Sequence, residues 1–173
     1  SPLAADASPL PMTAAPVMDE VVQTHVVGLT LERQDGLVVR SSSAGVVTTI
    51  DVKPGSIIRA DDRIGSVGDT PIFAFTGSAP LHRSLGVGSK GRDVQRLQRF
   101  LHEAGLLRAG PDGQFGRETA EAVERWNESH GRAGRTFDVE AVAWIGDGPL
   151  TVATILARPG DRLDTNAGLV QGP

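Results

Sequence analysis

The chain has 173 residues, of which 39% are hydrophobic and 22% charged, which is typical of one globular domain or two small ones. A formal net charge of −4 and an aromatic content of 4% argue against a nucleic-acid-binding protein, which would present a basic patch or base-stacking rings. Cysteine is absent, so disulfides, thiol nucleophiles and thiolate metal sites are excluded.

Residues 1–20 are predicted to form a flexible, Pro-rich linker. Four prolines stand there among Ala, Ser and Thr: Pro2, Pro9, Pro11 and Pro16. Proline neither continues a helix nor fits the interior of a sheet. The chain starts at Ser1 and has no apolar run near the roughly 20 residues that span a bilayer. We therefore expect a fragment that meets a membrane only through a segment outside this sequence.

Residues 21–79 are predicted to be the first part of a β module. Short runs of Val, Ile and Thr alternate with Gly and Pro-Gly turns, which indicates short strands joined by tight turns. The expected strands lie at Val21–Leu31, Leu37–Val39, Val46–Val52, Ile57–Ile58, Ile64–Val67 and Pro71–Phe75.

A second copy of this pattern lies in residues 135–173, the predicted second part of the β module. Val47–Ile58 aligns with Val152–Leu163 without a gap, and the same offset aligns Ile64 with Leu169. Each copy reads as strand, Pro-Gly turn, strand, because Pro presets φ and Gly permits φ > 0. A chance recurrence of a basic-Pro-Gly turn would explain the turn alone, but several apolar positions match as well. One hairpin cannot bury a core, so we expect two facing halves.

Residues 80–134 form the predicted helical module between these halves. One helix is expected to open at Ser89–Gly91 and end at Gly105, and a second to run from Gly116 to Gly131. The apolar faces comprise Val94, Leu97, Phe100, Leu101 and Ala104 on the first helix and Thr119, Ala122, Val123 and Trp126 on the second, with Phe115 between them. So small a core is marginal alone, and we expect the β module to support it.

The two predicted helices carry a specific pattern. Gly88–Gly105 reads G-x-x-G-x-D-V-x-x-L-Q-x-x-L-x-x-x-G, and Asp112–Trp126 reads D-G-x-F-G-x-x-T-x-x-A-V-x-x-W. This pattern resembles the small helical peptidoglycan-binding domain of cell-wall hydrolases and envelope proteins, over Leu81–Gly131. That family usually has Gln where this chain has Asn127, and it often adds a third helix where Arg135–Val139 reads as a return to strand.

The flanking β pattern has a resemblance of its own. Gly45–Ile64 resembles half of the lipoyl-like domain of periplasmic membrane-fusion (adaptor) proteins, and Leu150–Val170 would be the other half. Gly68–Leu85 is similar to the join in adaptor-like envelope proteins of actinobacteria, which carry a peptidoglycan-binding module in place of a coiled-coil hairpin. The resemblance implies an α+β fold, in which a small helical peptidoglycan-binding-like module is inserted between two repeated halves of a lipoyl-like β module.

Most residues of the helical pattern would be core or turn positions, which leaves the polar ones for contact with peptidoglycan. These candidates are Arg92, Asp93, Gln98, Asp112, Gln114, Arg117 and Asn127. A stem peptide offers carboxylates and amides, so an arginine with a nearby amide suits it. Asp93 is also an ordinary helix-start residue, because the helix dipole favours an anion there.

The sequence shows no catalytic constellation, and we expect no cofactor and no metal. Lys53 has the wrong neighbours for a lipoyl or biotin carrier, and its repeat partner is Arg158. The histidines lack metal-ligand spacing, although His102 and His130 could approach each other on paired helices. Acids that follow the Pro-Gly turns are expected to be turn and solubility residues: Asp61, Asp62, Asp161 and Asp164.

These resemblances imply a non-catalytic, extracytoplasmic protein of a bacterial cell envelope that binds the stem peptide or glycan of peptidoglycan. It would be the adaptor subunit of an efflux or ABC-type transporter, with a membrane permease as partner and no nucleic acid. The alternative is the wall-targeting part of a peptidoglycan hydrolase whose catalytic domain lies outside this sequence. A third interpretation is a structural fold whose wall-binding surface has been lost.

Overall fold

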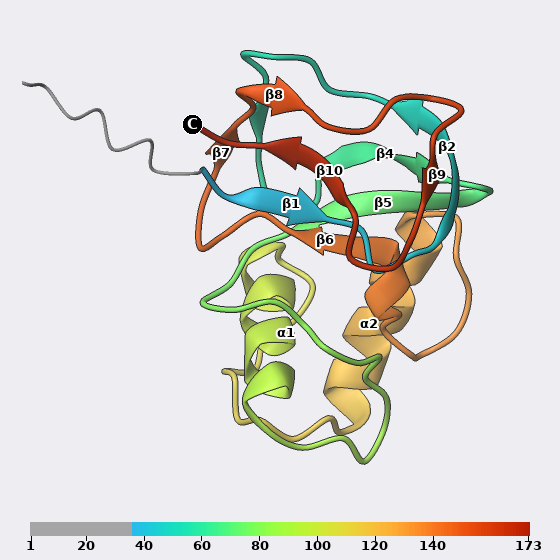
Figure 1. Ribbon diagram of the computed structural model, residues 1–173. Helices are drawn as coiled ribbons and strands as arrows, with labels where there is room; N and C mark the ends of the chain where they lie inside the picture. The colour runs from blue at the N-terminus through green and yellow to red at the C-terminus, as the bar shows by residue number, and fades with distance from the viewer. Residues whose placement is uncertain (1–35) are drawn as a thin grey trace, which may run out of the picture. The chain divides into compact units, whose positions relative to one another are not determined.

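The computed structural model describes residues 36–173, so the predictions for residues 1–20 and Val21–Leu31 lie outside the described residues. The strands are β1 (Val38–Arg40), β2 (Gly45–Ile50), β3 (Ile57–Ile58), β4 (Arg63–Val67), β5 (Thr70–Phe75), β6 (Val142–Trp144), β7 (Leu150–Thr151), β8 (Thr154–Ile155), β9 (Arg162–Leu163) and β10 (Gly168–Gln171). The helices are α1 (Arg92–Glu103), α2 (Arg117–Ser129) and the 3-10 helix η1 (Val139–Ala141). The α+β composition and the short strands are confirmed (Figure 1).

The repeat read from the sequence is confirmed as a two-fold arrangement of strands. β3 pairs antiparallel with β7 and places Ile58 opposite Leu150. β9 pairs antiparallel with β2 and places Leu163 opposite Gly45. The repeat offset takes Ile58 to Leu163 and Gly45 to Leu150, so each pairing is the image of the other. Each half therefore contributes a short strand that pairs with a strand of the other half.

The two Pro-Gly turns are equivalent in the same way. The N–H of Gly55 donates to the carbonyl of Val152, and the N–H of Gly160 donates to the carbonyl of Val47, each at 2.8 Å. Gly55 has φ +87° and Gly160 has φ +97°, a region that favours glycine because it has no Cβ. Both turns thus have the conformation that their residue chemistry predicts.

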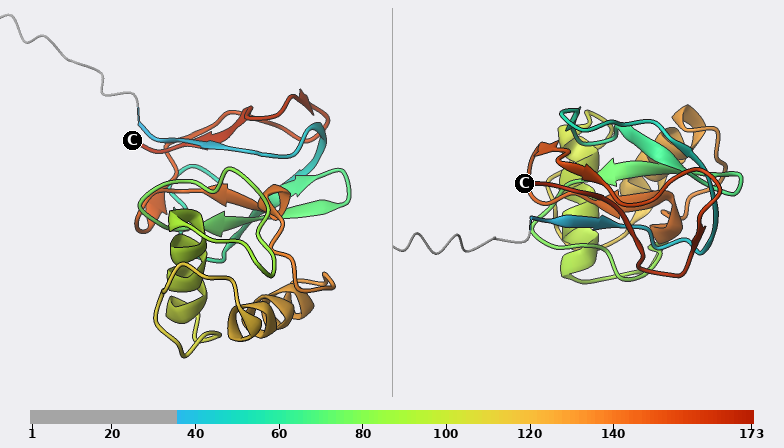
Figure 2. Two further views of the ribbon diagram at one scale, coloured as in Figure 1. Left: turned by 90° about the horizontal axis from the view of Figure 1, so that it is seen from below. Right: turned by 45° about the horizontal axis from the view of Figure 1, so that its top comes forward.

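β1 completes the second half from the far end of the chain (Figure 2). It pairs antiparallel with β10 as β5 pairs with β4, and both pairs contain a register shift. Val39 lies opposite Val170, and Ile72 lies opposite Gly65. The repeat offset aligns Gly65 with Val170, so Val39 on β1 is equivalent to Ile72 on β5. The repeat alone could not show this relationship, because β1 lies before the first aligned copy, which begins at Val47.

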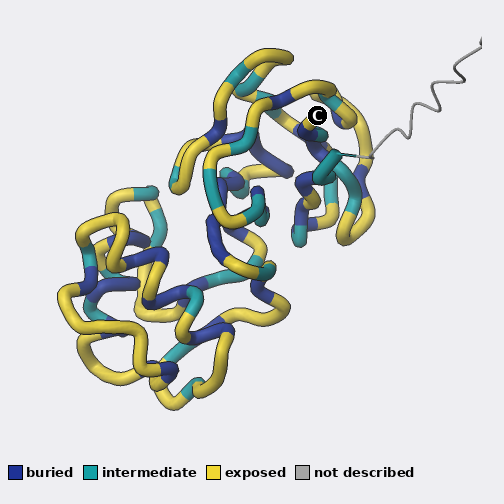
Figure 3. The backbone as a smooth tube through the Cα atoms, turned by 90° about the vertical axis from the view of Figure 1, so that its left-hand side faces the viewer, coloured by how far each residue is buried: buried dark blue, intermediate teal, exposed yellow. Residues whose placement is uncertain are grey.

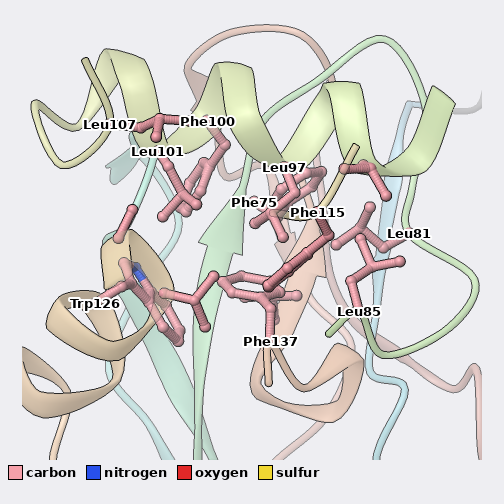
Figure 4. Close-up of a cluster of buried hydrophobic side chains, with 14 of the residues drawn as sticks. Phe75, Leu81, Leu85, Leu97, Phe100, Leu101, Leu107, Phe115, Trp126 and Phe137 are labelled. Atoms are coloured by element: carbon pink, nitrogen blue, oxygen red, sulfur yellow. The ribbon is translucent and has the colours of Figure 1, made fainter. Parts of the chain in front are cut away.

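The helical module shares a buried core with the β module, so the expected support is confirmed. The ring centroid of Phe75 on β5 lies 5.0 Å from that of Phe100 on α1, and Trp126 on α2 lies 5.8 Å from Phe73. Figure 4 shows the side chains of Phe75, Phe100 and Trp126 pointing toward one another. Trp126 is fully buried, and its truncation to alanine would cost about 3–5 kcal/mol.

A second buried cluster fills the β module, where residues from both halves pack together. Its members include Val47, Ile64, Val152 and Leu169. Buried stretches, drawn in dark blue, therefore occur along the strands as well as the helices (Figure 3).

Both helices end just before the glycines at which the sequence predicts their ends, Gly105 and Gly131. After α1, Gly105 has φ +75° and its N–H donates to the carbonyl of His102, while the N–H of Leu106 donates to the carbonyl of Leu101. After α2, Gly131 has φ +70°, and the equivalent bonds run from the N–H of Gly131 to the carbonyl of Glu128 and from the N–H of Arg132 to the carbonyl of Asn127. This double bond pattern is the Schellman motif, which satisfies carbonyls at a helix end. One expectation was wrong: Ala104 is the exposed cap of α1 and not part of its buried face.

The prediction of a strand at Arg135–Val139 is also wrong. Residues Val139–Ala141 form η1, and the chain rejoins the sheet only at β6, which runs parallel to β5. The carboxylate of Asp138 accepts the N–H of Glu140 at 2.9 Å and pairs with Arg132 at 2.7 Å. An aspartate in this capping position favours a helical turn over a strand, which explains the difference.

Candidate functional site

The starts of the two helices lie side by side at one end of the helical module. The N–H of Gly91 donates to the carbonyl of Gly113 at 3.0 Å, and the N–H of Phe115 donates to Ser89 at 2.9 Å. These bonds pair the residues before α1 with those before α2. Two helix N-termini therefore converge, and both dipoles favour an anion at this end.

Gln98 holds this end of the module together. The side chain is 2% exposed, and its Nε2 group, which carries two hydrogens, lies within hydrogen-bond distance of three acceptors: Oδ1 of Asp112 at 2.8 Å, the carbonyl of Gln114 at 3.0 Å and the hydroxyl of Thr119 at 3.1 Å. Its Oε1 atom accepts the N–H of Gly113 at 2.8 Å. Every polar atom of the amide is thus bonded within the protein, so Gln98 positions the turn before α2.

Asp112 and Gln114 lie beside Gln98, so three of the seven predicted residues come together. Asp112 is exposed, and its Oδ1 atom accepts the N–H of Gln114 at 2.8 Å. This bond and the one from Gln98 hold the pKa of Asp112 below its usual range. The Gln114 residue is exposed, which leaves it accessible to a ligand.

Asp93 is buried in a network of its own at the start of α1, where it is 4% exposed. Its Oδ2 atom accepts the Nε–H of Arg83 at 2.6 Å, and its Oδ1 atom accepts the N–H of Val94 at 2.9 Å. The bond from Arg83 is the main cause that lowers the pKa of Asp93. A ligand would have to displace Arg83 to reach this carboxylate.

Arg92 and Arg117 are the two cations of the predicted set, and both are exposed. Each is the first residue of its helix, so both arise from the end where the helix starts converge. The Arg117 side chain is 86% exposed and has only a long ion pair, of 3.7 Å, with Glu121. These guanidinium groups can turn toward a carboxylate in solution.

Asn127 lies away from this end and is 1% exposed. Its Nδ2 group donates to the carbonyls of Gly134 and Thr136, at 2.8 and 3.1 Å. The side chain therefore fastens the loop that follows α2, while its Oδ1 atom has no hydrogen-bond partner within the described chain.

Sequence reasoning missed a junction between Asp61 and α2. Oδ1 of Asp61 lies 2.8 Å from Nε1 of Trp126 and 2.8 Å from Nε2 of His130. Burial raises the pKa of Asp61, although both bonds act in the opposite direction. The sequence holds one weak signal that Asp61 occupies a special position, because the repeat aligns it with Asn166. Both residues have positive φ in the structure, a conformation that Asp and Asn tolerate best after glycine.

A cavity with a volume of about 790 Å³ lies elsewhere among residues 36–173. Its apolar wall includes Phe75, Leu81, Val139 and Trp144, and its polar groups include Arg40, His82, Glu140 and Asn166. None of the seven predicted residues lines it. A ligand held there would therefore contact a different face from the one that the helical pattern predicts.

No group of three or more His, Asp or Glu residues within the described range is placed to hold a metal ion. His102 bonds the carbonyl of Leu107, whereas His130 bonds Asp61 and Trp126, so the two rings take partners from different segments. Across residues 36–173, no helix is both long and apolar enough to cross a membrane.

Comparison with protein families matches residues 90–133 to the family described as "Putative peptidoglycan binding domain". The match spans α1, α2 and the turn between them, so the resemblance of the helical module is confirmed. It indicates an association with the cell wall, and it extends to neither the β module nor η1. No curated protein and no solved structure matches the chain.

Proposed function

We propose that this protein is a non-catalytic component of a bacterial cell envelope that binds peptidoglycan through its helical module. The family match at residues 90–133 carries this proposal, and the intact helical core supports it. Because α1 and α2 pack on β5 and β6, the module is presented on a rigid support.

The binding surface is the end where the two helices start. Arg92, Gln114 and Arg117 are exposed there and supply two cations and an amide. Carboxylates of a stem peptide match guanidinium groups, and two convergent helix dipoles add to the attraction. Asp93 and Gln98 act behind this surface, because their side chains are bonded within the protein, and Asn127 lies away from it and fastens the loop after α2.

We further propose that the β module is lipoyl-like and belongs to the extracytoplasmic adaptor of a transporter. The observation in favour is the two-fold arrangement of strands, interrupted between its halves by the helical module. Such an adaptor holds a permease at one surface and the wall at another. Co-purification of the full-length protein with a permease from detergent-solubilised membranes tests this role, and its absence in a strain that expresses both argues against it.

Sedimentation with insoluble peptidoglycan tests the wall-binding function. The wild-type protein should pellet with the polymer, and the double variant Arg92→Ala/Arg117→Ala should lose at least about tenfold in affinity, since each charge-assisted bond contributes about 1.5–3 kcal/mol. Arg158→Ala is the matched control, because this exposed arginine lies in a turn of the β module. A wild-type protein that stays in the supernatant contradicts the proposal.

A further inference from the structure

A small hollow lies between α1 and the loops that leave β5 and β6. Six residues line it: Thr76, Gly77, Arg96, Arg99, Glu103 and Asp147. The three from α1 share one face of the helix, and the loops are joined by the N–H of Gly77, which bonds the carbonyl of Gly146 at 2.9 Å. The hollow has a volume of about 10 Å³, which admits one water-sized group. We call it the α1 hollow.

Four charged side chains surround the α1 hollow, two of each sign. Within residues 36–173, Arg96 and Arg99 make no ion pair of 4.0 Å or less, and neither do Glu103 and Asp147. Other arginines of the same region do pair, as Arg83 does with Asp93. The rim therefore offers both donors and acceptors to a ligand.

Thr76 supplies a further group with unused bonding capacity. The residue is 8% exposed, and its hydroxyl is buried without a hydrogen-bond partner in the described protein. A buried hydroxyl is stabilised when it is bonded, and buried polar groups in proteins nearly always are. A ligand oxygen that enters the hollow would complete this bond.

We propose that the α1 hollow and its charged rim bind the free end of a diamino acid, where an ammonium and a carboxylate share one carbon. One carboxylate oxygen fills the hollow, and the other atoms of this end lie on the rim. Arg96, Arg99 and the Thr76 hydroxyl donate to the carboxylate, and Glu103 and Asp147 accept from the ammonium. A simple anion or cation leaves two of the four protein charges unmatched. The inference rests on the proposed function, because diamino acids with such an end occur in peptidoglycan stem peptides.

Titration of the whole chain with meso-diaminopimelate tests the inference directly. Amide NMR shifts of Thr76, Gly77 and Asp147 should move saturably with this probe. Pimelate lacks both ammonium groups and 1,5-diaminopentane lacks both carboxylates, so each should bind at least about tenfold more weakly. The proposal is overturned if diaminopimelate moves none of these signals, or if pimelate binds equally well.

Two variants separate binding from folding. Thr76→Val keeps the side-chain volume and removes a hydroxyl that bonds nothing in the protein, so the affinity should fall about tenfold without a lower melting temperature. Asp147→Asn should weaken binding similarly, whereas the exposed Arg108→Gln, just past α1, should not. A Thr76→Val protein with a lower melting temperature and unchanged affinity assigns this residue a structural role and overturns the inference.

The sedimentation experiment keeps the two proposals apart. If the protein pellets with peptidoglycan but free diaminopimelate does not bind, the α1 hollow inference fails and the proposed function stands. If diaminopimelate binds but the protein stays in the supernatant, wall binding fails and the α1 hollow remains a site for an amino-acid zwitterion.

Discussion

Nε2 of His130 lies 2.8 Å from Oδ1 of Asp61, and the pair joins the last turn of α2 to the turn between β3 and β4. Nε1 of Trp126 donates to the same oxygen at 2.8 Å. The imidazole stacks on the indole with centroids 4.1 Å apart, which aims both donors at one carboxylate. A single acid in a turn of the β module thus fastens the helical module to it.

Asp61→Ala should lower the free energy of unfolding by about 1–3 kcal/mol, because it leaves two N–H groups without their acceptor. Urea denaturation followed by tryptophan fluorescence measures the change, since Trp126 lies at the junction. Asp69→Ala serves as control, because Asp69 is exposed in the β4–β5 hairpin and should differ from wild type by less than about 0.5 kcal/mol. Equal stability of the two variants would show that the junction contributes nothing.

Gln98→Ala should cost about 1–3 kcal/mol of folding free energy and loosen the turn before α2. The change leaves the N–H of Gly113 and the hydroxyl of Thr119 without a partner. Gln95→Ala, on the exposed side of α1, is the matched control and should be nearly neutral. Hydrogen exchange at Gly113 provides the local readout, and retained protection in Gln98→Ala would argue against this role.

Stability should depend on the charge of Asp93 at low pH. The bond from Arg83 lowers the folded pKa of Asp93 below the unfolded value of about 3.9, so its contribution is present above that pH and is lost as pH falls through the folded pKa. Wild type and Asp93→Asn should therefore differ most near neutral pH and converge below about pH 4. Denaturation at a series of pH values measures this, and a pH-independent gap would contradict it.

The two Pro-Gly turns should be equally sensitive to substitution. Gly55→Ala and Gly160→Ala each place a Cβ on a residue with positive φ, which should cost about 1–2 kcal/mol. Gly148→Ala is the control, because an added Cβ there meets nothing within 4 Å and its φ lies outside that region. Thermal denaturation compares the three, and a large difference between Gly55 and Gly160 would argue against two equivalent halves.

Local chemistry made much of this protein predictable from its sequence. Glycine at the end of each helix, Pro-Gly in each turn and apolar residues at helical spacing each act over a few neighbouring residues. The aligned repeat added one long-range inference, because two copies of a hairpin need each other to bury a core. The helix ends at Gly105 and Gly131 and the pairing of the halves follow from these features.

Only the tertiary structure decided which polar side chains remain accessible. Gln98 and Asn127 look like ligand contacts in the pattern, yet their amides are buried and bonded to segments that follow their helices. Asp61 looks like a turn residue, yet its partners come from α2. The pairing of β1 with β10 is of the same kind. A hydrogen bond between residues far apart in the chain leaves no local signature, because its geometry exists only after both segments have packed.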